Sequence, residues 1–249
     1  MPGVDLFTQL GASAWMTTDA SRLQHALQRA RFDVMGVASR RALAGDLAGG
    51  NAEVKTLLDG NPQMRGWCVI HPVFPERSSE EMRRYLSNPK WLGAVLHPGR
   101  TGESLASGAT REVLNAYRRY TKPVLVHVAD EEAVRQLEQL AAEFNGIKFI
   151  ASGAGGDDWQ ACMYAAKRTV NIFLEPFSGG AHRGKVEAMV GIVGGHRVLF
   201  ASNYPEYNPG AALGTLLDAK ITDAEKQSVL TGNANRLFGF NRQPVEPEA

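Results

Sequence analysis

The sequence has few cysteines, little net charge and no long hydrophobic run, and each shortage excludes a class of protein. Its 249 residues include two cysteines, Cys68 and Cys162, whose spacing fits neither a zinc motif nor a disulfide framework. The formal net charge is +1, so we expect no binding to nucleic acid or to an anionic membrane. No apolar run approaches the roughly 20 residues of a membrane span, and the N-terminus lacks the basic flank of a signal peptide. By elimination we expect a cytoplasmic protein.

Short apolar segments alternate with amphipathic ones from end to end. The apolar runs, rich in Val, Ile, Leu and Phe, are typical of parallel strands that helices cover on the outside. They predict strands over residues 4–8, 33–39, 65–71, 92–97, 123–129, 147–152, 170–175 and 197–202. Amphipathic patterns predict helices over residues 19–30, 78–87, 111–120 and 131–144.

About eight such repeats without a break in composition predict an α/β fold, a (β/α)8 TIM barrel. A doubly wound sheet is the alternative, although it needs no eightfold repeat. We expect one domain over residues 1–241 and a polar, proline-bearing tail over residues 242–249. Near the end, Thr222 and Glu225 have the spacing of a capping box that begins a helix.

Active sites of such barrels lie at the carboxyl ends of the strands, and only alternate strand residues point inward. These rules select residues at the ends of the first, fourth, fifth and eighth strands, namely Phe7, Gln9, Val95, His97, His127 and Asn203. Asn203 directly follows Ser202, where a barrel enzyme would be expected to carry an acid. An amide forms hydrogen bonds but cannot transfer a proton near neutral pH.

Six segments resemble, in order, the motifs of the amidohydrolase-related (amidohydrolase 2) barrels, a family of metal-dependent hydrolases and decarboxylases. They are VDLFTQLG, LGAVLHP, KPVLVHVAD, KFIASGAGG, RVLFASNYP and GNANRLFGF. Each motif alone is weak, but their order and spacing over nearly the whole chain resemble this family closely. The resemblance implies an amidohydrolase-like TIM barrel.

The departures from the family pattern fall on its metal ligands. The resemblance places the first two histidine ligands on Phe7 and Gln9, a later histidine on Gly153, the aspartate on Asn203 and a lysine on Val95, while His127 is retained. Phenylalanine and glycine have no ligating side chain, and carboxamides are poor zinc ligands. We therefore predict a protein without a metal or other cofactor.

Two substitutes for the missing groups stay open. His71, His97 and His127 end neighbouring strands and could together bind zinc, or the first two, each followed by proline, only turn the chain. Glu175 and Asp130 could replace the missing acid, or they only cap the helices that follow.

These observations favour a catalytically degenerate homologue that binds a small polar ligand or a partner protein, as a homo-oligomer or in complex with an active paralogue. The predicted pocket is lined by Phe7, Gln9, His97, His127, Gly153 and Asn203. The alternatives are a metal-bound sensor that does not hydrolyse, and an active hydrolase or lyase that is metal-independent or uses a rebuilt site around His97 and His127. The candidate catalytic residues are His127, Asn203 and Glu175.

Overall fold

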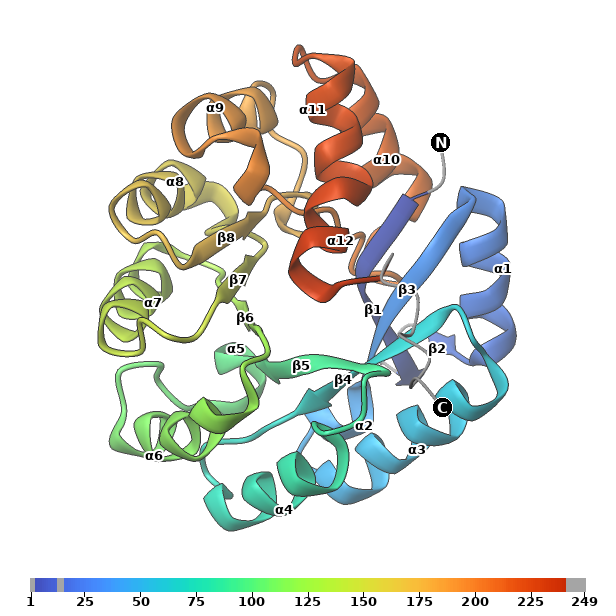
Figure 1. The fold of residues 1–249 in the computed structure, drawn as a ribbon, viewed down its shortest axis with the longest axis vertical. Coiled ribbons are helices and arrows are strands. Elements are labelled where there is room, and N and C mark those ends of the chain that lie inside the picture. Colours follow the sequence, from blue (N-terminus) through green and yellow to red (C-terminus); the bar gives the residue numbers. More distant parts are fainter. Residues whose placement is uncertain (1–2, 13–15, 241–249) are drawn as a thin grey trace, which may run out of the picture.

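A computed structural model describes residues 3–12 and 16–240 and shows a curled sheet surrounded by helices (Figure 1). The strands are β1 (Gly3–Ala12), β2 (Thr17–Thr18), β3 (Phe32–Ser39), β4 (Met64–Val69), β5 (Trp91–Leu96), β6 (Val124–His127), β7 (Phe149–Ser152) and β8 (Ile172–Glu175). Their order in the sheet is β2-β1-β3-β4-β5-β6-β7-β8. All neighbours pair in parallel except β2, which forms an antiparallel hairpin with the end of β1.

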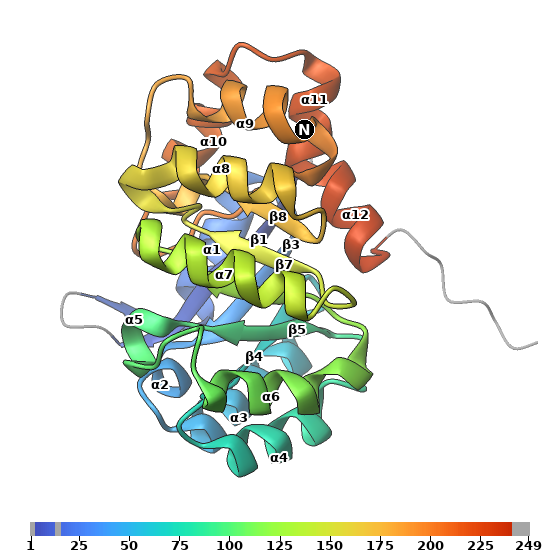
Figure 2. The ribbon, with the colours of Figure 1, turned by 90° about the vertical axis from the view of Figure 1, so that its left-hand side faces the viewer.

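Helices cover the outside of the sheet between successive strands (Figures 1 and 2). They are α1 (Ala20–Ala30), α2 (Arg40–Leu43), α3 (Leu47–Gly60), α4 (Pro75–Tyr85), α5 (Pro98–Thr101), α6 (Gly108–Tyr117), α7 (Glu131–Glu143), α8 (Trp159–Arg168), α9 (Lys185–Val193), α10 (Pro209–Asp218), α11 (Asp223–Gln227) and α12 (Asn233–Phe238). The four predicted helices are present as α1, α4, α6 and α7, although α4 begins at Pro75 and α6 ends in a short 3-10 turn. The predicted capping box of Thr222 and Glu225 begins α11.

The segment after α9 closes the barrel, but it is not a regular strand as the sequence predicted. Single bridges join it to both neighbours, Leu174 to Val198 and Thr8 to Tyr204. The ladder is interrupted because the Asp5 carboxylate accepts the Ser202 N–H at 2.8 Å, a group that would otherwise pair with backbone. The fold class predicted from the sequence, an α/β (β/α)8 barrel, is confirmed with this local difference.

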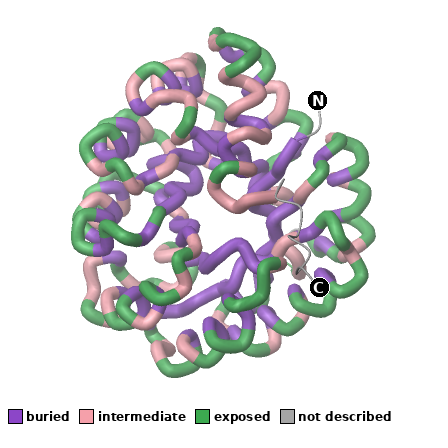
Figure 3. The backbone as a smooth tube through the Cα atoms, in the orientation of Figure 1, coloured by how far each residue is buried: buried purple, intermediate pink, exposed green. Residues whose placement is uncertain are grey.

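Alternate strand residues form two nested cores, as expected of a filled barrel. Val95 lies in the inner core, while its neighbours Ala94 and Leu96 pack against the helices. A register shift between Asp5 and Thr8 lets both Leu6 and Phe7 join the inner core. Figure 3 shows most of the central strands buried and most exposed residues on the outer helices and loops.

The C-terminal helix closes one end of the barrel and leaves the other end to the loops that follow the strands. The Phe238 ring at the end of α12 packs edge-on against Trp67 of β4, with centroids 5.9 Å apart. Figure 2 shows α12 at one end and α5 at the other. The predicted tail, residues 242–249, lies outside the described residues, and the single-domain boundary stays a prediction. In the described ranges, no helix is long and apolar enough to cross a membrane.

Candidate functional site

The carboxyl ends of the strands bring together five of the residues predicted from the sequence, which we call the barrel mouth: Phe7, Gln9, His97, His127 and Asn203. The Gln9 Nε2 donates to Asn203 Oδ1 at 2.5 Å. The Phe7 ring meets His127 edge-on at 5.1 Å, and His127 stacks on His97 at 4.0 Å. Phe7, Gln9 and Asn203 are at most 7% exposed, so these three side chains are almost completely withdrawn from solvent.

The two stacked imidazoles are neutral at physiological pH. Burial, aided by the positive charge of Arg100, lowers the pKa of His97 to about 4. Burial lowers the pKa of His127 well below its usual value, and His97 and Arg100 add to that effect. A neutral imidazole has one nitrogen that donates and one that accepts, so each ring can accept a hydrogen bond from a ligand.

Buried polar atoms without a hydrogen-bond partner gather at this end of the barrel. Among the described side chains these atoms are Gln9 Oε1, Thr18 Oγ1, Arg40 Nε, Arg40 Nη1, His97 Nδ1 and His127 Nε2. Each belongs to a residue at or just beyond the carboxyl end of a strand, or in the β1–β2 hairpin. Native proteins leave few such atoms unpaired, and each one calls for a partner such as water or a ligand.

Arg40 is the site residue that our sequence analysis missed. It directly follows β3 and is 6% exposed. Its Nη2 donates to Glu206 at 2.5 Å, while Nε and Nη1 have no partner. Arg100 lies 3.9 Å from the same Glu206 carboxylate. The rule that selects residues at strand ends points to Arg40 as well, because this arginine is the first residue after β3.

Gly153 and Glu175 lie beside the mouth but have structural roles. Gly153 has φ +78°, a conformation in which any residue with a side chain is strained. An added Cβ would also lie 3.3 Å from the Val128 carbonyl oxygen. The Glu175 carboxylate accepts from the backbone N–H groups of residues 153, 177 and 178 and from the hydroxyls of Ser152 and Ser178. Burial raises its pKa. Five donors saturate this carboxylate, which leaves it poorly placed to accept a proton from a ligand.

The other candidate acid, Asp130, also has a structural role. Its side chain accepts the Ala133 N–H at 2.8 Å and is the N-cap of α7. The carboxylate therefore begins a helix, as one of our two interpretations expected.

A second buried carboxylate closes the barrel beneath the mouth. Asp5 of β1 accepts from the Ser202 hydroxyl at 2.5 Å and from the Ser202 N–H at 2.8 Å. Burial raises its pKa to about 7. These bonds hold residues 202 and 203 against β1 and so position Asn203 beside Gln9.

The described residues do not fit the metal that the family resemblance implies. They contain no group of three or more His, Cys, Asp or Glu side chains placed to hold an ion. His71, which might have completed a set with His97 and His127, turns to its own loop: its Nδ1 accepts the Val73 N–H at 3.3 Å and its ring packs on Phe74 at 4.9 Å. Two imidazoles alone fall short of the three protein ligands usual at a catalytic zinc.

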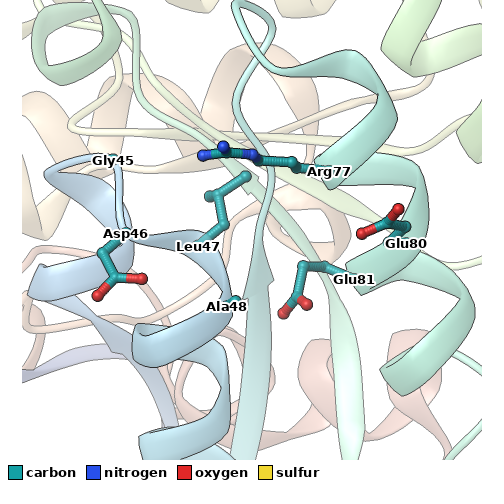
Figure 4. A pocket seen from close by; sticks show the side chains of 7 residues that line it. All are labelled: Gly45, Asp46, Leu47, Ala48, Arg77, Glu80 and Glu81. Carbon is teal, nitrogen blue, oxygen red and sulfur yellow. The ribbon is translucent and has the colours of Figure 1, made fainter.

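The charged cleft in Figure 4 is a separate feature on the outer surface. The side chain of Arg77 extends from α4 toward Leu47 of α3 at this cavity of about 400 Å³. Two of its carboxylates already have partners, because Asp46 pairs with Arg41 and Glu81 pairs with Arg84. Unlike the mouth, the cleft contains none of the described buried polar atoms that lack a hydrogen-bond partner.

Solved structures similar to this chain share its fold at low sequence identity. A dihydroxybenzoic acid decarboxylase from Polaromonas sp. JS666, solved with manganese and 2-nitroresorcinol, superposes with a TM-score of 0.80 at 13% identity, over 97% of this chain and 98% of that one. A 2,6-dihydroxybenzoate decarboxylase from Rhizobium gives 0.79 at 13% identity, over 97% and 99%. A 5-carboxyvanillate decarboxylase from Sphingomonas paucimobilis gives 0.77 at 12% identity, over 96% and 99%.

The sequence comparisons agree with the fold. Among curated proteins, none matches the chain significantly. The model of one protein family, described as amidohydrolase, matches residues 18–240. That match spans most of the chain, from the β1–β2 hairpin to the end of α12, so the chain belongs to the amidohydrolase family.

Proposed function

We propose that this chain is a ligand-binding member of its family that holds a small anionic molecule at the barrel mouth without metal-dependent hydrolysis. The observation that carries the proposal is the set of unpartnered buried polar atoms, all at one end of the barrel. Donors and acceptors withdrawn from water cost free energy until a partner satisfies them. A ligand with both a carboxylate and hydroxyl groups would supply those partners, because the carboxylate accepts from Arg40 and a hydroxyl can donate to Gln9 Oε1.

Arg40 favours an anion over a neutral ligand. Its guanidinium is nearly buried, and two of its nitrogens, Nε and Nη1, have no partner, so each can donate to an anionic oxygen. The mouth residues themselves are neutral, and Glu206 offsets only part of the charge of Arg40 and Arg100. The ligand class is therefore a small carboxylate rather than the neutral or weakly anionic molecule that the mouth alone would suit.

The absence of hydrolysis is argued from the chemistry of the side chains. Asn203 cannot act as a general base, and the described residues offer no set of metal ligands. Gly153 has a backbone conformation that disfavours any side chain, so a histidine ligand at this position would be strained.

The test uses 2,6-dihydroxybenzoate, because one of the similar solved structures is a decarboxylase of this acid. Resorcinol, which lacks the carboxylate, is the control ligand. Isothermal titration should detect binding of 2,6-dihydroxybenzoate but not of resorcinol. Arg40→Met should weaken the binding of the acid about tenfold or more, since hydrogen bonds to charged groups contribute roughly 1.5–3 kcal/mol. Arg41→Met is the matched control, because this neighbouring arginine is exposed and pairs with Asp46. Release of resorcinol from the acid, or equal binding by both variants, would overturn the proposal.

An active hydrolase or lyase is the second candidate. It is favoured by the stacked pair of His97 and His127, each with a free nitrogen at the mouth. Turnover of any substrate that His127→Asn abolishes would support it. Assembly with a second copy or with an active paralogue stays a prediction, which light scattering after gel filtration tests.

A further inference from the structure

A second cavity lies outside the barrel, between α1 and α10, and none of the proposals above uses it. Its volume is about 590 Å³, within the range of small-molecule sites. The two helices are neighbours at the closure of the barrel (Figure 1). Its walls come from the last two turns of α1, the start of α10 and Tyr204.

The cations of this cavity have no acidic counterpart. Among the described residues that line it are two arginines, Arg29 and Arg31, and there is no Asp or Glu. Neither arginine takes part in an ion pair within the described ranges. Positive charges that share a concave surface repel one another and concentrate anions there. The cavity therefore favours an anionic occupant.

Arg31 has a backbone conformation that disfavours residues with a side chain. It caps the end of α1 with φ 58° and ψ 42°, the left-handed region where helices usually place glycine or asparagine. A β-carbon in this region costs free energy relative to glycine. Glycine would therefore stabilise this helix end more than arginine does, and what the arginine adds is a positive charge at the cavity.

The remaining wall is apolar and aromatic. Ala26 and Ala30 of α1, Leu213 of α10 and the ring of Tyr204 line the cavity together with the arginines. An occupant therefore contacts both positive charge and apolar surface. Tyr204 follows Asn203 directly, and its carbonyl accepts the Gln9 N–H at 2.7 Å, so this cavity and the mouth share one segment of chain but not their cations.

We propose that the α1–α10 cavity binds a small organic phosphate, whose phosphate group contacts Arg29 and Arg31 and whose apolar body lies against Tyr204 and Leu213. Arginine forms paired hydrogen bonds with phosphate oxygens. The cavity is too small for a folded partner, and its charge suits a dianion better than a neutral metabolite.

Isothermal titration of the full chain with phenyl phosphate, inorganic phosphate and benzyl alcohol tests the proposal. We expect phenyl phosphate to bind more tightly than inorganic phosphate and benzyl alcohol not to bind. Arg29→Gln and Arg31→Gly should each raise the dissociation constant of phenyl phosphate about tenfold. Arg83→Gln, which removes an exposed arginine from the last turn of α4, should leave it unchanged.

Two further comparisons separate this site from a folding defect and from the mouth. Arg31→Gly should melt no lower than the native chain, because glycine adopts φ 58° without steric cost, so lost binding in this variant reflects the lost cation. Arg40→Met should leave phenyl phosphate binding unchanged. A loss of binding that follows Arg40 instead of Arg29 and Arg31, equal affinity for both phosphates, or no binding at all would overturn the proposal.

Discussion

Replacing Phe7 with histidine would restore the residue type that the family resemblance implies at this position, and we expect it to destabilise the protein. Phe7 is 0% exposed and packs on His127 at 5.1 Å. Burying a phenylalanine ring contributes roughly 1.5–3 kcal/mol, and an imidazole recovers only part of that. An imidazole N–H without a partner costs about 1–3 kcal/mol more, while a new bond to an unpartnered atom such as Gln9 Oε1 returns about 0.5–1.5 kcal/mol.

The expected net loss for Phe7→His is about 2–4 kcal/mol, or roughly 4–16 °C in melting temperature for a chain of this size. Thermal melts followed by circular dichroism, with and without zinc, measure it. Phe7→Leu is the control, because it keeps an apolar group and should cost less. An equal or higher melting temperature for Phe7→His in the absence of metal would refute the reasoning, since the mouth would then hold polar partners suited to an imidazole.

Four further predictions concern the mouth and the residues beside and beneath it. Elemental analysis after purification without chelator should find no stoichiometric zinc, iron or manganese, and about one ion per chain would contradict the side-chain argument. Asn203→Asp alone should restore no hydrolysis of lactones or amides, because a carboxylate without an activated water has nothing to deprotonate; a gain of several orders of magnitude would contradict this. Because burial raises the pKa of Asp5 to about 7, its carboxylate is disfavoured in the folded state, and the contribution of Asp5 to stability should fall by about 3 kcal/mol between pH 4 and pH 7. Urea unfolding at the two pH values should show a smaller fall in Asp5→Asn, and an unchanged fall would exclude Asp5 as its cause. Gly153→Ala should lower stability by about 1–2 kcal/mol, because φ is +78° there, whereas an unchanged urea midpoint would show that this backbone relaxes.

The order of strands and helices was readable from the sequence, because local periodicity and capping chemistry determine it. The capping box of Thr222 and Glu225 depends on residues three apart, and the structure confirms it. The alternation of inward and outward side chains also placed Phe7, Gln9, His97 and Asn203 at one end of the barrel, since the ends of parallel strands lie together.

The tertiary structure alone decided how these residues meet. The contact between Gln9 and Asn203 joins residues 194 positions apart, and it depends on the shift of register in β1 and on Asp5 holding Ser202. The buried state of Arg40 depends on where Glu206 lies across the closure of the barrel, which no local pattern encodes. Local sequence thus determined the elements and the end of the barrel that carries the site. The unpaired donors and the neutral imidazoles follow from packing between distant segments.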